Sequence, residues 1–183
     1  MVISVVGRTD KRPVIYTLMK LFQALGDCCV LTHDRHLRRL IEDSGGDLGH
    51  FQNILIAVSD ASPDEIFLEM GYRKIDFEYI IFDCTDMIPD DSDLVIWVGG
   101  ADGITEDDET LLSMYPGYKE CNLGFGKGSI PYTAEMFKAC EEIEGFKHLA
   151  LPSPQIASRL ATFLTELLNM PVRDILKVVG NKK

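Results

Sequence analysis

The first 26 residues constrain the fold of this chain more than any other segment. Val2 to Val6 is a continuous apolar run with the length of a buried β-strand, and the polar loop Gly7 to Arg12 follows it. Pro13 then stands where proline favours the first turn of a helix, and the apolar residues after it recur at helical spacing. A strand, a polar loop and a helix in this order form the layout of a phosphate-binding α/β unit.

The loop lacks the side chains that hold phosphate in such units. A phosphate-binding loop is rich in glycine, so that its backbone N–H groups close around the phosphates, and it ends in Gly-Lys-Ser or Gly-Lys-Thr. Here the loop contains one glycine, Gly7, and the helix opens with Pro13-Val14-Ile15. The layout therefore predicts a nucleotide-binding fold, while the side chains predict that phosphoryl hydrolysis is absent.

Short apolar runs alternate with helix-like segments along the chain, a pattern typical of βαβ units around a mostly parallel sheet. We therefore predict an α/β fold, a Rossmann-like or P-loop-like three-layer sandwich in which helices flank the sheet. The expected strands are Val2–Val6, Cys28–Thr32, Asn53–Val58, Tyr79–Phe82, Leu94–Val98 and His148–Leu151. The expected helices are Pro13–Leu25, His36–Asp43, Pro63–Met70, Ala134–Ile143 and Gln155–Asn169.

Length and composition predict a single α/β domain over residues 1–183. The chain is 46% hydrophobic and 26% charged, which is ordinary for a soluble globular protein. No apolar run approaches the roughly 20 residues that span a bilayer, and no export signal opens the chain, so we expect a cytoplasmic protein. Residues 99–131 interrupt the alternation with an acidic start followed by glycines and aromatics, and we expect an irregular insertion there.

Cysteine usage and net charge indicate which cellular compartment and which class of partner to expect. Five cysteines form no Cys-x-x-Cys pair, and Cys28, Cys29 and Cys84 lie in apolar strand-like runs, so we expect reduced, buried thiols. The net charge of −11 at pH 7 disfavours direct DNA binding, because DNA affinity comes mainly from lysine and arginine contacts with phosphates. We therefore expect protein partners.

The opening segment also resembles the ParA/MinD-type ATPases, a branch of the P-loop proteins that includes the pilus-localising TadZ/CpaE proteins. Ile3 to Val6 and Leu21 to Gly26 fit the segments that flank the phosphate loop of that family. Val14 then falls at the place of the phosphate lysine, and Ile15 at the place of the magnesium-binding hydroxyl. The resemblance implies a member without catalytic residues in this loop.

Later segments extend the resemblance. Val30 to Asp34 is similar to the second strand of the family, with Asp34 as its remaining acid, and Ser92 to Val98 resembles a later strand. Phe77 to Cys84 resembles the strand whose terminal acid helps to organise magnesium, and Asp83 takes that place. The resemblance implies a pseudo-ATPase that acts as a scaffold or interaction protein in secretion or pilus assembly, or in partition of DNA cargo. It also implies a homodimer.

A second hypothesis keeps a ligand at this edge of the sheet, and makes the protein a nucleotide- or phospholigand-binding enzyme or sensor. Strand-end carboxylates suit a magnesium ion, and a helix N-terminus suits a phosphate. The simplest form of this second hypothesis is a weak nucleotide site without a resident cofactor. The competing interpretation is that the acids cap loops and the bases are solvated loop charges. The candidate cofactor-binding residues are Gly7, Arg8, Lys11, Arg12, Asp34 and Asp83.

Three further patterns give weaker signals. His33 and His36 supply only half of a zinc site, so we expect no metal centre. Leu123 to Gly128 is similar to a glycine-rich phosphate loop, but no clear strand precedes it, and we expect a turn or hairpin.

Aromatic residues are enriched in interface hot spots. The aromatic residues expected to form a contact surface for a partner are Tyr115, Tyr118, Phe125 and Tyr132.

Overall fold

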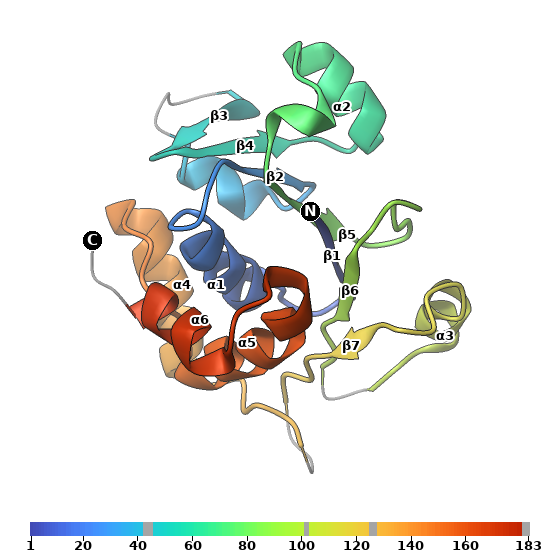
Figure 1. Ribbon diagram of the computed structural model, residues 1–183, viewed down its shortest axis with the longest axis vertical. Coiled ribbons are helices and arrows are strands. Elements are labelled where there is room, and N and C mark those ends of the chain that lie inside the picture. Colours follow the sequence, from blue (N-terminus) through green and yellow to red (C-terminus); the bar gives the residue numbers. More distant parts are fainter. Residues whose placement is uncertain (42–45, 101–102, 125–127, 181–183) are drawn as a thin grey trace.

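The computed structural model describes residues 1–41, 46–100, 103–124 and 128–180, which form a sheet covered by helices on both faces (Figure 1). The seven strands follow the order β3-β4-β2-β5-β1-β6-β7, and all neighbours are parallel except β3 and β4. The predicted three-layer α/β fold with a mostly parallel sheet is confirmed. The strands are β1 (Val2–Val6), β2 (Cys28–Thr32), β3 (Leu48–Phe51), β4 (Ile54–Val58), β5 (Tyr79–Cys84), β6 (Leu94–Trp97) and β7 (Lys119–Glu120).

Two helical layers enclose the sheet. One face carries α1, α4, α5 and α6, and the other carries α2 and α3 (Figure 1). Because successive strand residues point to opposite faces, Ile3 and Val5 of β1 join the core under α1, whereas Val2 and Val6 join the core under α2. The α-helices are α1 (Arg12–Phe22), α2 (Pro63–Met70), α3 (Glu106–Leu112), α4 (Ala134–Phe146), α5 (Pro154–Leu168) and α6 (Val172–Gly180), and the 3₁₀ helices are η1 (Arg35–Arg39) and η2 (Lys74–Asp76).

Helix α2 shows how local sequence places a boundary. The Ser62 side chain accepts a hydrogen bond from the backbone N–H of Glu65, whose carboxylate accepts one in return from the Ser62 backbone. Pro63 occupies the first helical position, and Gly71 ends the helix in the left-handed conformation. These signals lie within ten residues of one another, and the predicted helix Pro63–Met70 is confirmed.

The predicted strand His148–Leu151 is wrong. These residues form a connection between α4 and α5, and Leu149 is buried without joining the sheet. The edge beside β6 is instead taken by β7, which pairs Lys119 with Ile96. An apolar run satisfies the burial requirement of a strand, but pairing depends on which segment reaches the edge.

Other differences concern helix type and extent. The predicted helix His36–Asp43 is wrong in type and start: a 3₁₀ helix, η1, covers Arg35–Arg39, while Glu42 and Asp43 lie outside the described residues. Segment 99–131 was expected to be irregular, yet its acidic start forms α3, which Thr105 caps. Three further elements, β3, β7 and α6, do not follow from the sequence patterns above.

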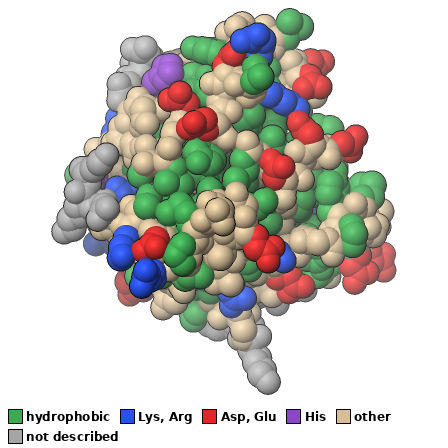
Figure 2. Space-filling model, in the orientation of Figure 1, with side chains coloured by type: hydrophobic (Ala, Val, Ile, Leu, Met, Phe, Trp, Pro, Cys, Tyr) green, Lys and Arg blue, Asp and Glu red, His purple; other side chains and the backbone are tan. Residues whose placement is uncertain are grey.

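The described residues contain no helix that is both long enough and apolar enough to cross a bilayer. All five cysteines are free and buried, which confirms that Cys28, Cys29 and Cys84 act as small core residues. Figure 2 shows aspartate and glutamate side chains spread over one face of the molecule rather than gathered into a single patch.

Candidate functional site

The loop between β1 and α1 lies at the carboxyl edge of the parallel sheet, where open α/β sheets bind their ligands. An open pocket of about 490 Å³ adjoins it. Five of the six candidate residues line this pocket: Gly7, Arg8, Lys11, Asp34 and Asp83. The sixth, Arg12, points away into the helical layer. The structure therefore brings together most of the candidate residues of the second hypothesis.

Gly7 lets the loop pass close to β6. Its φ angle is +134°, a conformation that side-chain-bearing residues rarely adopt, and a Cβ atom would lie 2.3 Å from the carbonyl oxygen of Val98. The glycine at this position is required by the close approach of two backbones. Its presence therefore has a complete explanation without a phosphate ligand.

Lys11 forms a buried ion pair with Asp83. Its ammonium lies 2.6 Å from Oδ1 of Asp83 and donates to the carbonyl oxygen of Cys84 at 2.7 Å. The other carboxylate oxygen of Asp83 accepts from the Thr32 hydroxyl at 2.6 Å. The Lys11 side chain is 7% exposed and that of Asp83 only 1%. The loop therefore contains a cation, but β5 supplies its counter-ion from within the chain.

Asp10 occupies the N-terminus of α1, where an anionic ligand would otherwise be stabilised. The backbone N–H of Arg12 donates to Oδ1 of Asp10 at 3.0 Å, and Pro13 has no N–H to offer. The Arg12 guanidinium and the Tyr132 hydroxyl donate to the same carboxylate. Burial opposes ionisation of Asp10, but these hydrogen bonds outweigh it and lower its pKa. The helix end thus carries an internal anion.

Arg12 belongs to a network that joins α1 to α4. Its guanidinium donates to Glu144 at 2.9 Å and to Glu141 at 3.1 Å, and it lies over the ring of Phe137. Burial disfavours the charged guanidinium, yet the hydrogen bonds to carboxylates dominate and raise its pKa. Arg12 is 4% exposed, so it is a structural cation rather than a ligand-binding one.

Glu144 is the central residue of this network, and it is not among the residues predicted from the sequence. Its carboxylate accepts from the hydroxyl of Tyr16 at 2.9 Å and from Arg39 at 3.1 Å, in addition to Arg12. A usable signal existed in the sequence. Glu144 lies one helical turn after the buried Cys140, on the apolar stripe of α4, and a carboxylate at such a position requires buried partners.

The remaining polar candidates are satisfied locally. Asp34 caps η1 by accepting from the backbone N–H of His36 at 2.9 Å and lies 2.7 Å from its Nδ1, which agrees with the loop-cap interpretation. His33 contacts the Asp83 carbonyl and the Thr85 hydroxyl instead. The described part of the chain contains no group of three or more histidine, cysteine or acidic side chains arranged to hold a metal ion.

Arg8 is the most accessible cation of the loop. It pairs with Asp107 of α3 at 2.8 Å and approaches Asp86 at 3.8 Å, with about half of its side chain exposed. Asp86 is itself exposed and lines the neighbouring pocket. The three strand-end acids Asp34, Asp83 and Asp86 thus have separate roles, as a helix cap, a member of a buried ion pair and a surface carboxylate.

The tyrosines expected to form one contact surface are divided between the two faces of the sheet. Tyr115 and Tyr118 pack against the core under α2 and α3, and Tyr115 donates to the carbonyl of Ile88 at 2.8 Å. Tyr132 packs on the opposite side, against the core under α1 and α4. All three are partly buried, and Phe125 lies outside the described residues.

Comparison with protein-family models finds no match, and neither does comparison with curated proteins. Two solved structures from Aquifex aeolicus align with this chain at low sequence identity. A chain of the MinC:MinD cell division protein complex aligns over 100% of this chain and 97% of its own, with 13% identity and a TM-score of 0.48. The MinD cell division protein aligns over 100% and 98%, with 11% identity and a TM-score of 0.45. Likenesses at this level carry no functional argument.

Proposed function

We propose that this protein is a non-catalytic interaction or scaffold protein, in which a nucleotide-type α/β frame has been kept and phosphoryl chemistry has been lost. One observation carries the proposal: the groups that would hold a phosphate are already bound to carboxylates of the same chain. Asp10 accepts a hydrogen bond from the backbone N–H of Arg12 at the start of α1, and Asp83 forms an ion pair with the Lys11 ammonium.

The chemistry supports this proposal. Phosphoryl transfer depends on positioned cations and magnesium that stabilise the charge of the transferred group. Lys11 is neutralised by Asp83, Arg12 is turned into the helical layer, and the helix opens without a hydroxyl at Ile15. A bound phosphate would be repelled by Asp10. The rigid sheet and its two helical layers remain as a platform for partners.

Calorimetric titration of ATP, ADP and GTP, with and without magnesium, tests the proposal. We expect no heat of binding at millimolar nucleotide. Micromolar, magnesium-dependent binding contradicts the proposal and supports the second hypothesis, a nucleotide- or phospholigand-binding enzyme or sensor that uses the strand-end carboxylates at this open pocket.

A variant of the loop sharpens this test. Asp10→Ala removes the internal anion, so we expect it to bind inorganic pyrophosphate more tightly than the unaltered protein. Asp90→Ala removes an exposed carboxylate that does not line this pocket and is the charge-matched control. Equal pyrophosphate binding by Asp10→Ala and Asp90→Ala would contradict the role given to Asp10.

The partner class is part of the same proposal. We propose a protein partner and a homodimer, in a secretion, pilus-assembly or cargo-partition setting, on the resemblance of the loop and strand segments to the ParA/MinD-type ATPases. Sedimentation velocity without nucleotide measures the oligomeric state, and a monomer at all accessible concentrations would contradict the homodimer.

A further inference from the structure

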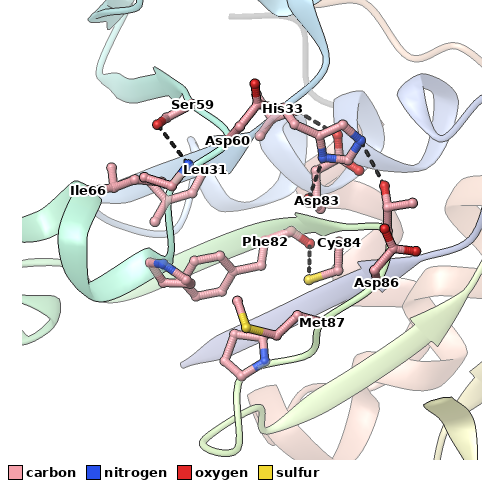
Figure 3. Close-up of a pocket in the computed structure, with 15 residues that line it drawn as sticks. Leu31, His33, Ser59, Asp60, Ile66, Phe82, Asp83, Cys84, Asp86 and Met87 are labelled. Atoms are coloured by element: carbon pink, nitrogen blue, oxygen red, sulfur yellow. Dashed lines mark hydrogen bonds between the residues drawn. The ribbon is translucent and has the colours of Figure 1, made fainter.

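A second pocket, of about 430 Å³, lies beside the candidate site at the same edge of the sheet (Figure 3). It is bounded by the ends of β2, β4 and β5 and by the start of α2. His33, Asp83 and Thr85 line both pockets, and the hydrogen bond between His33 and Thr85 makes them a shared wall. Concave sites at the carboxyl ends of parallel strands are where such folds bind ligands, and the proposed loss of phosphate chemistry does not affect this pocket.

The lining of this pocket is largely apolar on the α2 side. Ile66 of α2 and Phe82 of β5 are buried beneath it, and the flexible Met87 borders it with 53% of its surface exposed. An unbranched methylene chain suits such a surface, because methionine adapts its shape and alkyl stems pack along apolar walls. The pocket therefore favours an elongated aliphatic group.

The charge of the lining has one sign. The 15 lining residues include three aspartates and no lysine or arginine. Asp83 is neutralised by Lys11, and Asp86 forms a loose ion pair with Arg8 at 3.8 Å, whereas Asp60 forms no ion pair within the described residues. The pocket therefore has one unpaired and one weakly paired carboxylate beside its apolar wall, and these attract a cation.

An anionic occupant is disfavoured by the nearby helix start. The N-terminus of α2 would attract an anion, but the chain already satisfies it. The backbone N–H of Glu65 in the first turn donates to the Ser62 hydroxyl, and the Glu65 carboxylate accepts a hydrogen bond from the Ser62 backbone N–H. Asp64 adds a further negative charge to the same turn. The field at the pocket is therefore set by carboxylates.

We propose that this pocket receives a lysine or arginine side chain of a protein partner. The aliphatic stem packs on Ile66, Phe82 and Met87, and the charged head lies near Asp60 and Asp86. The proposal rests on the proposed function in one respect, because it takes the occupant to belong to a protein.

Three probes of matched stem test the charge preference. The full-length protein, labelled with ¹³C at methionine and isoleucine methyl groups, is titrated with n-butylguanidinium, the neutral isostere n-butylurea and the anion pentanoate. The methyl signals of Met87 and Ile66 report binding. We expect n-butylguanidinium to bind about tenfold more tightly than pentanoate, because two carboxylates act on it. Equal affinities for the three probes overturn the proposal.

Variants locate the effect. The double variant Asp60→Asn/Asp86→Asn is expected to lower the affinity for n-butylguanidinium about fivefold, as two partly exposed charge pairs are removed. Asp90→Asn removes an exposed charge close to the pocket that does not line it, and we expect no change in affinity. A loss in Asp90→Asn equal to that of the double variant would show that only the overall charge matters, and would overturn the proposal.

A final arm distinguishes a partner side chain from a free cation. The capped peptide Gly-Arg-Gly is expected to bind with the same dependence on Asp60 and Asp86, whereas capped Gly-Glu-Gly is not. If n-butylguanidinium binds but Gly-Arg-Gly does not, the pocket receives a small free cation, and the proposal of a side chain from a protein partner is overturned. Nucleotide binding in the calorimeter contradicts the proposed function alone, whereas loss of the cation preference contradicts only this inference.

Discussion

At the level of single residues, the buried ion pair between Lys11 and Asp83 joins the loop before α1 to β5. A buried pair of this kind adds little net stability, but removal of one member leaves the other charge without compensation. We expect Asp83→Asn and Lys11→Met each to lower the free energy of unfolding by about 3 kcal/mol. The double variant should lose less than the sum of the two, because it leaves no isolated charge. Urea unfolding of the four proteins measures this double-mutant cycle.

The exposed carboxylate of Asp86 provides the control for this cycle. Its side chain is 80% exposed, so Asp86→Asn should change the free energy of unfolding by less than about 0.5 kcal/mol. Strict additivity of Lys11→Met and Asp83→Asn would contradict the pairing.

At the level of elements, Asp10 links the start of α1 to α4 through Arg12, and this link depends on pH. Hydrogen bonds from Arg12 and Tyr132 outweigh the effect of burial and lower the pKa of Asp10 from its ordinary value of 3.8. The unfolded chain therefore binds a proton more readily, so this contribution to stability is complete above about pH 4 and is lost as pH falls through the lowered pKa. We expect Asp10→Asn to flatten the dependence of the free energy of unfolding on pH in this acidic range.

Tyr132→Phe provides an intermediate case for the same measurement. It removes one hydrogen bond to Asp10 and keeps those from Arg12. Urea unfolding at a series of pH values should therefore place it between the unaltered protein and Asp10→Asn. If Asp10→Asn keeps the full slope at acidic pH, the pH dependence arises from other carboxylates and the prediction fails.

At the level of the whole molecule, the cysteines report on packing. All five are buried, and burial raises the pKa of the thiols, to about 12 for Cys84 and about 11 for Cys121. Because the thiolate is the reactive species, we expect the native protein at neutral pH to react very slowly with a chromogenic disulfide reagent. All five thiols should react in denaturant. The variant Met87→Cys, at an exposed position, is the positive control for rapid reaction. Rapid labelling of a native cysteine would contradict the packing described above.

The sequence determined those features whose cause lies within a short segment. The strands Val2–Val6 and Cys28–Thr32 and the helix Pro63–Met70 have the predicted boundaries, because a continuous apolar run and a capping box act locally. The second hypothesis drawn from the sequence also placed Gly7, Lys11 and Asp83 at one edge of the sheet, because the carboxyl ends of parallel strands share that edge.

Pairing between groups across that edge depends on how distant segments of the chain pack together. Glu144 lies 132 residues from Arg12, and the two are joined because α4 packs beside α1. In the same way β7 rather than His148–Leu151 completes the sheet beside β6. Local patterns specify burial and secondary structure, whereas strand pairing and the neutralisation of buried charges depend on contacts between distant segments. These contacts pair the buried charges of the loop between β1 and α1 with carboxylates from other parts of the chain.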